Sequence, residues 1–519
     1  MKRAFVAFVA FVVFAGAASQ ASAQTFPTDD PVLKTIWNEG MENSQAYQLA
    51  QVLSDSIGPR LSGSPQHRAA NEWAVSKFQS WGIDARNEQY GTWRNWRRGI
   101  THVDMVQPWI RSLEAMALSW SPPTDGEIEV ELVSLPEFGS EAELASWLPM
   151  ASGKFVLISY PQPTCRPDYN WEEYATEESF EAMRTARAEA QDAWNERVNG
   201  VGGEQALTAR LEDAGALGVF KSRWPGNWGH QNISTAPTQR IPAVSVGCED
   251  YGLLSRLVAN NQGPVVRVDV ESEAMDDSPI FNTIAEIRGS EFPDEYILLS
   301  AHLDSWDGGT GATDNGTGNV IMMEAVRIIK QVFPNPKRSI VVGLWGAEEQ
   351  GLIGSRAFSE DHPEVVEGLQ ASFNQDNGTG RVVNLSMQGL TGAAGMFGSW
   401  ISQIPTEITR HIDLNIPGTP GGGGSDYASF VCYGAPSFSL SSLSWEYRYT
   451  WHTQRDTFDK IVFDEVKNNV VLTAMLIYLA SEDPERMPRD QRIMPVDDRT
   501  GDQREWPACR PARRAYERP

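Results

Sequence analysis

The most informative segment of this chain reads EYILLSAHLDSWDGGTGATDNGTGNVIMMEAVRIIKQVFP, residues 295–334. It begins with a short apolar run that predicts a buried strand over 295–301, and it ends with a helix-forming run over 317–333 that stops at Pro334. A glycine-rich loop carrying His302 and Asp314 lies between them. Strand, loop and helix in this order form the repeating unit of α/β folds with a parallel sheet.

The same pattern recurs further along the chain. A second buried strand is predicted over 339–345 and the end of a third over 372–375, and each precedes an acidic residue able to bind a metal. Open α/β sheets place their sites at the carboxyl ends of the strands. We therefore expect an α/β fold, with a mostly parallel or mixed central sheet, helices on both faces and a site at one sheet edge.

Changes in the pattern of apolar and polar segments along the sequence divide the chain into five parts. Residues 125–272 combine short strands with a polar helix over 171–199, carry no ligand set of their own, and indicate an inserted β-rich domain. The expected order is a signal peptide at 1–23, the first part of a catalytic domain at 24–124, the insertion at 125–272, the second part with the metal site at 273–485, and an irregular tail at 486–519.

The first residues are typical of an export signal. Lys2 and Arg3 precede an apolar run over 4–18 and the small-residue cleavage site Ala21-Ser22-Ala23. The alternative, a membrane anchor, is disfavoured because the run falls short of the roughly 20 residues that span a bilayer. We expect an exported protein, periplasmic or secreted, without a membrane anchor.

Composition restricts the partners. The formal net charge is −25, and removal of Lys2 and Arg3 makes it more negative by two. An acidic chain is a poor partner for nucleic acid or for anionic membrane surfaces. Four cysteines in an exported chain allow two disulfides in any of three pairings. Cys165 with Cys248 is the preferred pair because both lie in the insertion, and free buried thiols are the alternative. The oligomeric state stays open, a homodimer included.

Five side chains with metal-binding chemistry stand in an order that suits a two-metal hydrolytic site: His302, Asp314, Glu349, Asp376 and His452. Two zinc ions about 3.5–4 Å apart need one bridging carboxylate, with a histidine and a further carboxylate for each ion. Asp314 is the expected bridging residue, because the glycines before it let the backbone turn back beside His302.

Two further acids are the predicted catalytic residues, Glu348 and Asp304. Asp304 follows His302 by two residues, so both side chains leave a strand on one side, and Asp304 is expected to hold the second ring nitrogen of the histidine. The adjacent acids Glu348 and Glu349 point in different directions. We assign Glu349 to the metal and Glu348 to proton transfer.

Each signal has a plainer interpretation when taken singly. Acids favour helix starts, which would explain Glu348 and Glu349, and Asp376 before Asn377-Gly378 is a common turn residue. His452 could be an ordinary loop histidine beside aromatic residues. Only seven histidines occur in the chain, however, and two fall where the ligand order needs them. Jointly the five residues indicate a metal site.

These motifs resemble those of the di-zinc exopeptidase family that includes bacterial leucyl aminopeptidases and carboxypeptidase Q. The matching segments are residues 302–307, 311–314, 347–351 and 452–457, with further similarity at 57–64 and 424–427. The insertion is similar to a protease-associated domain through residues 153–158 and 241–244.

The resemblance implies a zinc-dependent exopeptidase acting on a peptide or dipeptide. One zinc would be held by His302, Asp314 and Asp376, and the other by Asp314, Glu349 and His452. Glu348 would be the general base for a water that bridges the two ions. The chain departs from the family at Asn315, where a second acid commonly follows the bridging residue across a cis peptide bond.

Other interpretations remain beside the peptidase. A single-zinc glutaminyl cyclase shares the architecture, although residues 349–355 have the peptidase form, and a non-catalytic receptor-like homologue would not need the complete ligand set. The sequence leaves open whether the enzyme is an aminopeptidase or a carboxypeptidase Q-like dipeptidase. Tyr447 and Tyr449 are candidate donors to an oxyanion, with aromatic packing as the alternative role.

Overall fold

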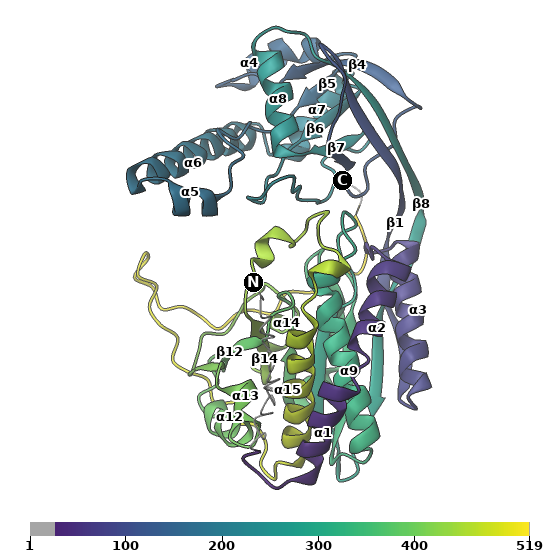
Figure 1. Ribbon diagram of the computed structural model, residues 1–519, viewed down its shortest axis with the longest axis vertical. Coiled ribbons are helices and arrows are strands. Elements are labelled where there is room, and N and C mark those ends of the chain that lie inside the picture. The colour runs from purple at the N-terminus through teal and green to yellow at the C-terminus, as the bar shows by residue number, and fades with distance from the viewer. Residues whose placement is uncertain (1–25, 518–519) are drawn as a thin grey trace, which may run out of the picture.

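The computed structural model describes residues 26–517, so the predicted signal peptide lies outside the described residues. Figure 1 shows two lobes joined by a long two-stranded ribbon. The ribbon consists of β1 (Asp84–Gln107) and β8 (Val265–Ile287), which pair antiparallel from Asp84–Glu286 at one end to Gln107–Val265 at the other. The lower lobe therefore continues into the upper lobe through hydrogen-bonded backbone.

The lower lobe is built on a mixed, mostly parallel sheet. Its centre is β9 (Phe292–His302), which pairs parallel with β10 (Arg338–Trp345) on one side and β11 (Leu369–Asn374) on the other. Outside these lie antiparallel β8 next to β10, parallel β14 (Ser437–Ser442) next to β11, then antiparallel β12 (Val382–Ser386) and, parallel to it, β13 (Asp413–Asn415). The predicted α/β class and the three predicted strands are confirmed.

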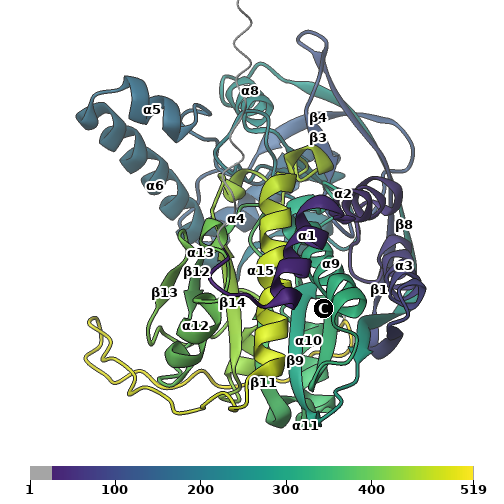
Figure 2. The ribbon, with the colours of Figure 1, turned by 60° about the horizontal axis from the view of Figure 1, so that its bottom comes forward.

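Both faces of this sheet are covered, because successive side chains of the central strand enter different apolar clusters. Ile297 and Leu299 pack into the largest cluster, whereas Leu298 packs into another. The first face carries α1 (Pro31–Glu42), α2 (Ala46–Gln51), α3 (Pro65–Ser80), α9 (Thr317–Val332), α12 (Ala393–Ile401) and α15 (Phe463–Glu482), of which α1, α9 and α15 lie together in Figure 2. The second carries α10 (Ile353–Asp361), α11 (Pro363–Gly368) and α14 (Ala428–Val431).

Helix α1 is one of the elements that the sequence analysis did not predict. Residues 31–42 form α1, which starts with Pro31 and is capped by the Asp30 carboxylate through the backbone N–H of Val32 at 2.7 Å. Proline at the first helical position after an aspartate cap is a known start signal. The other short elements of this lobe are the π-helical turns η1 (Val52–Ile57) and η3 (Ala312–Gly316), the helix α13 (Thr406–Thr409), and the 3-10 turns η4 (Tyr447–Tyr449) and η5 (Phe458–Lys460).

The upper lobe has apolar clusters of its own, and one of them begins at Val103 and Met105 of β1, before residue 125. The Cys165–Cys248 disulfide lies within this lobe, as predicted. The polar helix expected over 171–199 corresponds to α5 and α6. The elements are β2 (Arg111–Ser112), β3 (Ala115–Ala117), β4 (Ile128–Ser134), α4 (Glu141–Trp147), η2 (Leu148–Ala151), β5 (Phe155–Leu157), α5 (Asp168–Tyr174), α6 (Glu177–Gly200), α7 (Glu204–Asp213), β6 (Gly218–Lys221), β7 (Ala243–Val246) and α8 (Cys248–Ala259).

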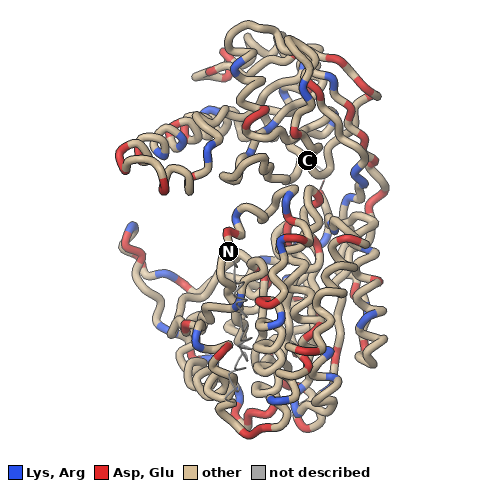
Figure 3. The backbone as a smooth tube through the Cα atoms, viewed as in Figure 1, with Lys and Arg blue, Asp and Glu red and all other residues tan. Residues whose placement is uncertain are grey.

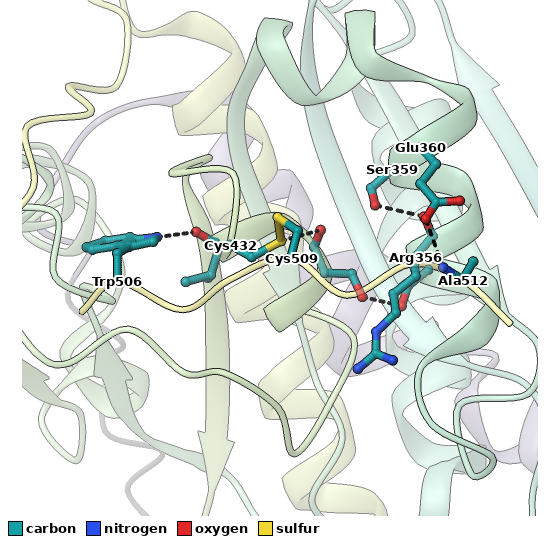
Figure 4. The surroundings of a disulfide bond; sticks show 10 residues. Arg356, Ser359, Glu360, Cys432, Trp506, Cys509 and Ala512 are labelled. Carbon is teal, nitrogen blue, oxygen red and sulfur yellow. Dashed lines mark hydrogen bonds between the residues drawn. A yellow bond between two sulfur atoms is a disulfide. The ribbon is translucent and has the colours of Figure 1, made fainter. Parts of the chain in front are cut away.

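The C-terminal tail forms neither helix nor strand between residues 483 and 517. A second disulfide, Cys432–Cys509, ties it to the end of α14, and Figure 4 shows the contacts around this bond. The Trp506 ring N–H donates to the Val431 carbonyl at 2.8 Å, and the Ala512 N–H donates to Glu360 at 2.8 Å. The tail is thus fastened across α14 and α10.

Between residues 26 and 517 no helix is both long enough and apolar enough to cross a bilayer. Figure 3 shows Asp and Glu spread over both lobes, in keeping with the acidic composition.

Candidate active site

Side chains at the carboxyl ends of three neighbouring parallel strands meet at the candidate site. His302 is the last residue of β9, Glu348 and Glu349 follow the end of β10, and Asp376 follows the end of β11. Their side chains meet because the carboxyl ends of parallel strands open onto the same edge of the sheet. The His302 side chain is 1% exposed, so the site lies at the base of the loops and not on the surface.

Asp314 lies between the two imidazoles. Its Oδ1 is 3.3 Å from His302 Nε2, and its Oδ2 is 3.3 Å from His452 Nε2. The loop that carries it, η3 (Ala312–Gly316), is fully buried and contains a cis peptide bond between Asp314 and Asn315. One carboxylate oxygen therefore faces each histidine, which is the arrangement of a bridging ligand.

Two groups of three side chains could each hold a metal ion, and Asp314 belongs to both. In the first, His302 Nε2 is 3.0 Å from Asp376 Oδ1, and in the second, His452 Nε2 is 2.8 Å from Glu349 Oε2. Within each group the ligand atoms lie within 4.8 Å of one another. All five side chains singled out from the sequence are brought together.

The chemistry of these groups fits zinc. Imidazole nitrogen and carboxylate oxygen are ordinary zinc ligands. Asp314 Oδ2 and Glu349 Oε1 are buried without a hydrogen-bond partner, although buried polar atoms are normally satisfied. A cation at each group would supply the missing partner.

The Asp304 carboxylate holds the backbone of the two glutamates, and it is the backbone carbonyl of Asp304 that lies within hydrogen-bond distance of the histidine ring. Its carboxylate accepts the N–H of Glu348 at 3.0 Å and of Glu349 at 3.3 Å, and the Ser62 hydroxyl at 3.0 Å. His302 Nδ1 instead contacts the Asp304 carbonyl oxygen at 3.0 Å, while the carboxylate is 3.7 Å away. The expected carboxylate contact is thus corrected to a backbone contact, because three other donors engage the carboxylate.

The site concentrates negative charge in a buried place. Burial raises the pKa of Glu348 well above its usual range, and the charges of Asp376 and Asp426 add to this effect. Burial and the charge of Asp314 do the same to the pKa of Glu349. Burial lowers the pKa of His452, which favours the neutral imidazole that binds metal. So many acids in one site require compensating positive charge.

The loop after Tyr447 fixes the backbone of Asp314 through Asp456. Asp456 accepts the backbone N–H of Thr313 at 2.7 Å and of Asp314 at 3.0 Å. Burial would raise the pKa of Asp314, but hydrogen bonding to His302 and the charges of the two histidines hold it below its usual range, with a smaller contribution from Tyr447. Of the two candidate tyrosines, Tyr447 therefore lies at the site. Tyr449 is engaged elsewhere, by Arg448 at 3.0 Å.

Asp426 lies in the segment 424–427 that resembles the family, but the sequence analysis assigned it no role. It is fully buried, both carboxylate oxygens lack a hydrogen-bond partner, and burial together with the charge of Asp376 raises its pKa to about 7. Ser425 beside it accepts a hydrogen bond from Asn374 at 2.9 Å. No spacing rule marks such a residue, because it comes from a glycine-rich loop more than 40 residues from its neighbours.

Comparison with known proteins gives a consistent result. Residues 282–477 match the family model of peptidase family M28. Human carboxypeptidase Q is 27% identical over 454 residues, covering 87% of this chain and 88% of that protein. The mouse carboxypeptidase Q is 26% identical over 456 residues, with the same coverage of both chains.

Solved structures agree in fold. A peptidase M28 precursor from Shewanella amazonensis superposes with a TM-score of 0.64 at 24% identity, over 88% of this chain and 97% of its own. A zinc aminopeptidase from Bacillus subtilis superposes with a TM-score of 0.53 at 20% identity, over 86% and 97%. The matched family segment contains all five candidate ligands and Glu348.

Proposed function

Because this chain belongs to peptidase family M28, a metallopeptidase family and the one that the sequence motifs resemble, we propose that it is an exported di-zinc exopeptidase. It would remove residues from the end of a peptide or cleave a dipeptide. The observation that carries the proposal is the central position of Asp314, with its two oxygens each 3.3 Å from a different imidazole.

We assign the five proposed ligands to two zinc ions according to the two groups of side chains described above. His302, Asp314 and Asp376 would hold one zinc, and Asp314, Glu349 and His452 the other. When bound, the two ions would polarise the scissile carbonyl and acidify the attacking water. Glu348, which no ligand group uses, would accept the proton of that water on a carboxylate oxygen and deliver it to the nitrogen of the leaving amine.

Neighbouring residues would keep this geometry in place. Asp304 orients Glu348 and Glu349 through their N–H groups, so the base and the ligand beside it keep separate directions. Tyr447, which is buried beside the charges of Asp314 and Asp376, is the residue we propose to stabilise the developing oxyanion.

The remaining assignments concern organisation. We infer that residues 125–272 form an inserted protease-associated domain within a catalytic domain of residues 24–124 and 273–485. We also infer export, which the two disulfides support because such bonds persist in oxidising compartments.

The proposal is tested by product analysis combined with metal analysis. The purified protein is incubated with a mixture of free peptides and dipeptides, and the products are identified by mass spectrometry. We expect trimming from one terminus and two zinc ions per chain. Cyclisation of an N-terminal glutamine with one zinc per chain would instead indicate the cyclase, and absence of both products with no bound metal would indicate a receptor-like protein.

A further inference from the structure

One metal-binding loop of the lower lobe is fastened to the upper lobe. The Ile233 N–H donates to the carbonyl oxygen of His452 at 2.7 Å. The Gln454 side chain accepts the Gln231 N–H at 2.8 Å and donates to the Gly229 carbonyl at 2.7 Å. Asn232 and Thr453 also form an antiparallel bridge. The segment 229–233 is therefore hydrogen-bonded to the segment 452–454 at several consecutive positions.

Residues 229–233 belong to the upper lobe, since they lie between β6 and β7 and are hydrogen-bonded to that lobe. The Asn232 N–H donates to the Arg223 carbonyl at 3.1 Å. On its other side, the Ser119 N–H donates to the Ser234 carbonyl at 3.1 Å, and the Ala236 N–H to the Ser119 carbonyl at 2.9 Å. The position of residues 229–233 is thus set by the upper lobe.

Close packing supports the hydrogen bonds. Ile233 is fully buried, and a Cβ added to Gly308 of the lower lobe would lie 2.2 Å from its Cγ1. A Cβ added to Gly309 would lie 2.8 Å from the Thr453 carbonyl oxygen. Gly308 therefore lets the segment after His302 approach Ile233 of the upper lobe, and Gly309 lets the same segment approach the loop that carries His452.

The two metal-binding groups differ in their dependence on this contact. His302 and Asp376 are placed by the ends of β9 and β11, within the sheet of the lower lobe. His452 lies on a loop, has a positive φ of 55°, and its own carbonyl is held by Ile233 of the other lobe. Only the group of Asp314, Glu349 and His452 therefore contains a ligand whose backbone is fixed from the upper lobe.

We propose that residues 229–233 are a positioning segment for His452, and that docking of the upper lobe sets the affinity of the second metal-binding group. The inference rests on the proposed function, because it assumes that zinc binds both groups. Gln454 is the key positioning residue on the lower lobe, since its side chain joins the two segments twice. It is not a metal ligand and does not touch the reacting atoms.

The test is the substitution Gln454→Ala in the full chain. Zinc affinity is measured by competition with a chelator over a range of buffered free zinc. We expect one zinc to keep its affinity and the other to bind about 10- to 100-fold more weakly, the usual effect of losing an outer contact to a metal ligand. Activity lost at low free zinc should return when zinc is raised, with KM unchanged.

A second variant and a control complete the design. Gly308→Ala, which forces Ile233 away while leaving Gln454 intact, should weaken the same zinc. Gln79→Ala removes a comparable side-chain bond to a backbone carbonyl, at 3.2 Å on α3, and should leave both affinities unchanged. Equal zinc affinities in Gln454→Ala, Gly308→Ala and the unaltered chain would overturn the inference. Fewer than two zincs in the unaltered chain would instead remove the proposed function.

Discussion

Asp304 shows at the scale of single residues how the site separates two adjacent acids. Its carboxylate accepts both the Glu348 and Glu349 N–H groups, which fixes the backbone while the two side chains leave in different directions. Glu349 contacts His452 at 2.8 Å, which in the proposed function leaves Glu348 for proton transfer. The proposed separation of ligand and base would rest on these backbone hydrogen bonds.

Replacement of Glu348 by glutamine tests this division. The amide keeps the size of the side chain but cannot accept the proton, so kcat should fall by about 100-fold or more while two zincs remain bound. Zinc content by mass spectrometry and kcat on a dipeptide are the measurements. The matched variant Glu349→Gln should instead lose a zinc. Substantial activity in Glu348→Gln would show that another group is the base.

The sequence was sufficient to single out the five side chains that the structure brings together, because each follows a recognisable strand or lies in a motif of fixed order. It was not sufficient for Asp304 or Asp426. The His302–Asp304 spacing predicted a contact between side chains, whereas the competing donors Ser62, Glu348 and Glu349 hold the carboxylate at 3.7 Å from the ring. Such competition between distant donors has no local signature.

At the scale of elements, the apolar runs predicted β9, β10, the end of β11, and α9 closely, since buried strands and helices carry continuous hydrophobic patterns. The ribbon of β1 and β8 was not predicted. Large parts of both strands are exposed or half-buried, so their many polar residues interrupt the run of apolar residues that would indicate a buried strand. The ribbon is stabilised by pairing along its length, which only the folded chain reveals.

His362 joins two such elements and gives a pH-dependent prediction. At the end of α10, its Nε2 lies 3.0 Å from Glu88 of β1 and its Nδ1 lies 3.2 Å from Glu364. The hydrogen bond with Glu88 raises the pKa of His362 although burial opposes it. A raised histidine pKa stabilises the fold below about pH 6.5, and the contribution is lost as pH rises through the folded-state value.

His362→Gln should therefore lower the free energy of unfolding at pH 6 by about 1 kcal/mol or less, because the pair is partly exposed, and by still less at pH 9. Thermal unfolding of the zinc-loaded protein at both pH values measures the difference. The exposed His411→Gln serves as control. A destabilisation that grows with pH would contradict the assigned ion pair.

At the scale of the whole molecule, a buried ion pair links the lobes beside the site. Asp307, in the loop after His302, accepts two bonds of 2.9 Å from Arg98 of β1 and a further bond from the Ser119 hydroxyl. The two charged side chains are 18% and 6% exposed. Together with residues 229–233, this pair makes docking of the upper lobe part of the architecture of the site.

Replacing only Arg98 should lower the free energy of unfolding more than replacing both Arg98 and Asp307. Arg98→Met leaves a buried carboxylate without its cation and should destabilise the protein by about 3 kcal/mol, whereas Arg98→Met with Asp307→Leu should cost less. Denaturant unfolding of the zinc-loaded protein gives both values. A single variant within about 0.5 kcal/mol of the unaltered chain would show that the pair is not desolvated.

In the proposed site, Asp314 bridges two zinc ions. Anomalous diffraction from crystals of the zinc-loaded protein, recorded at the zinc absorption edge, tests it most directly. We expect two peaks about 3.5–4 Å apart, one on each side of the Asp314 carboxylate, with His302 and Asp376 on one and Glu349 and His452 on the other. A single peak, or peaks that leave Asp314 unbound, would contradict the account.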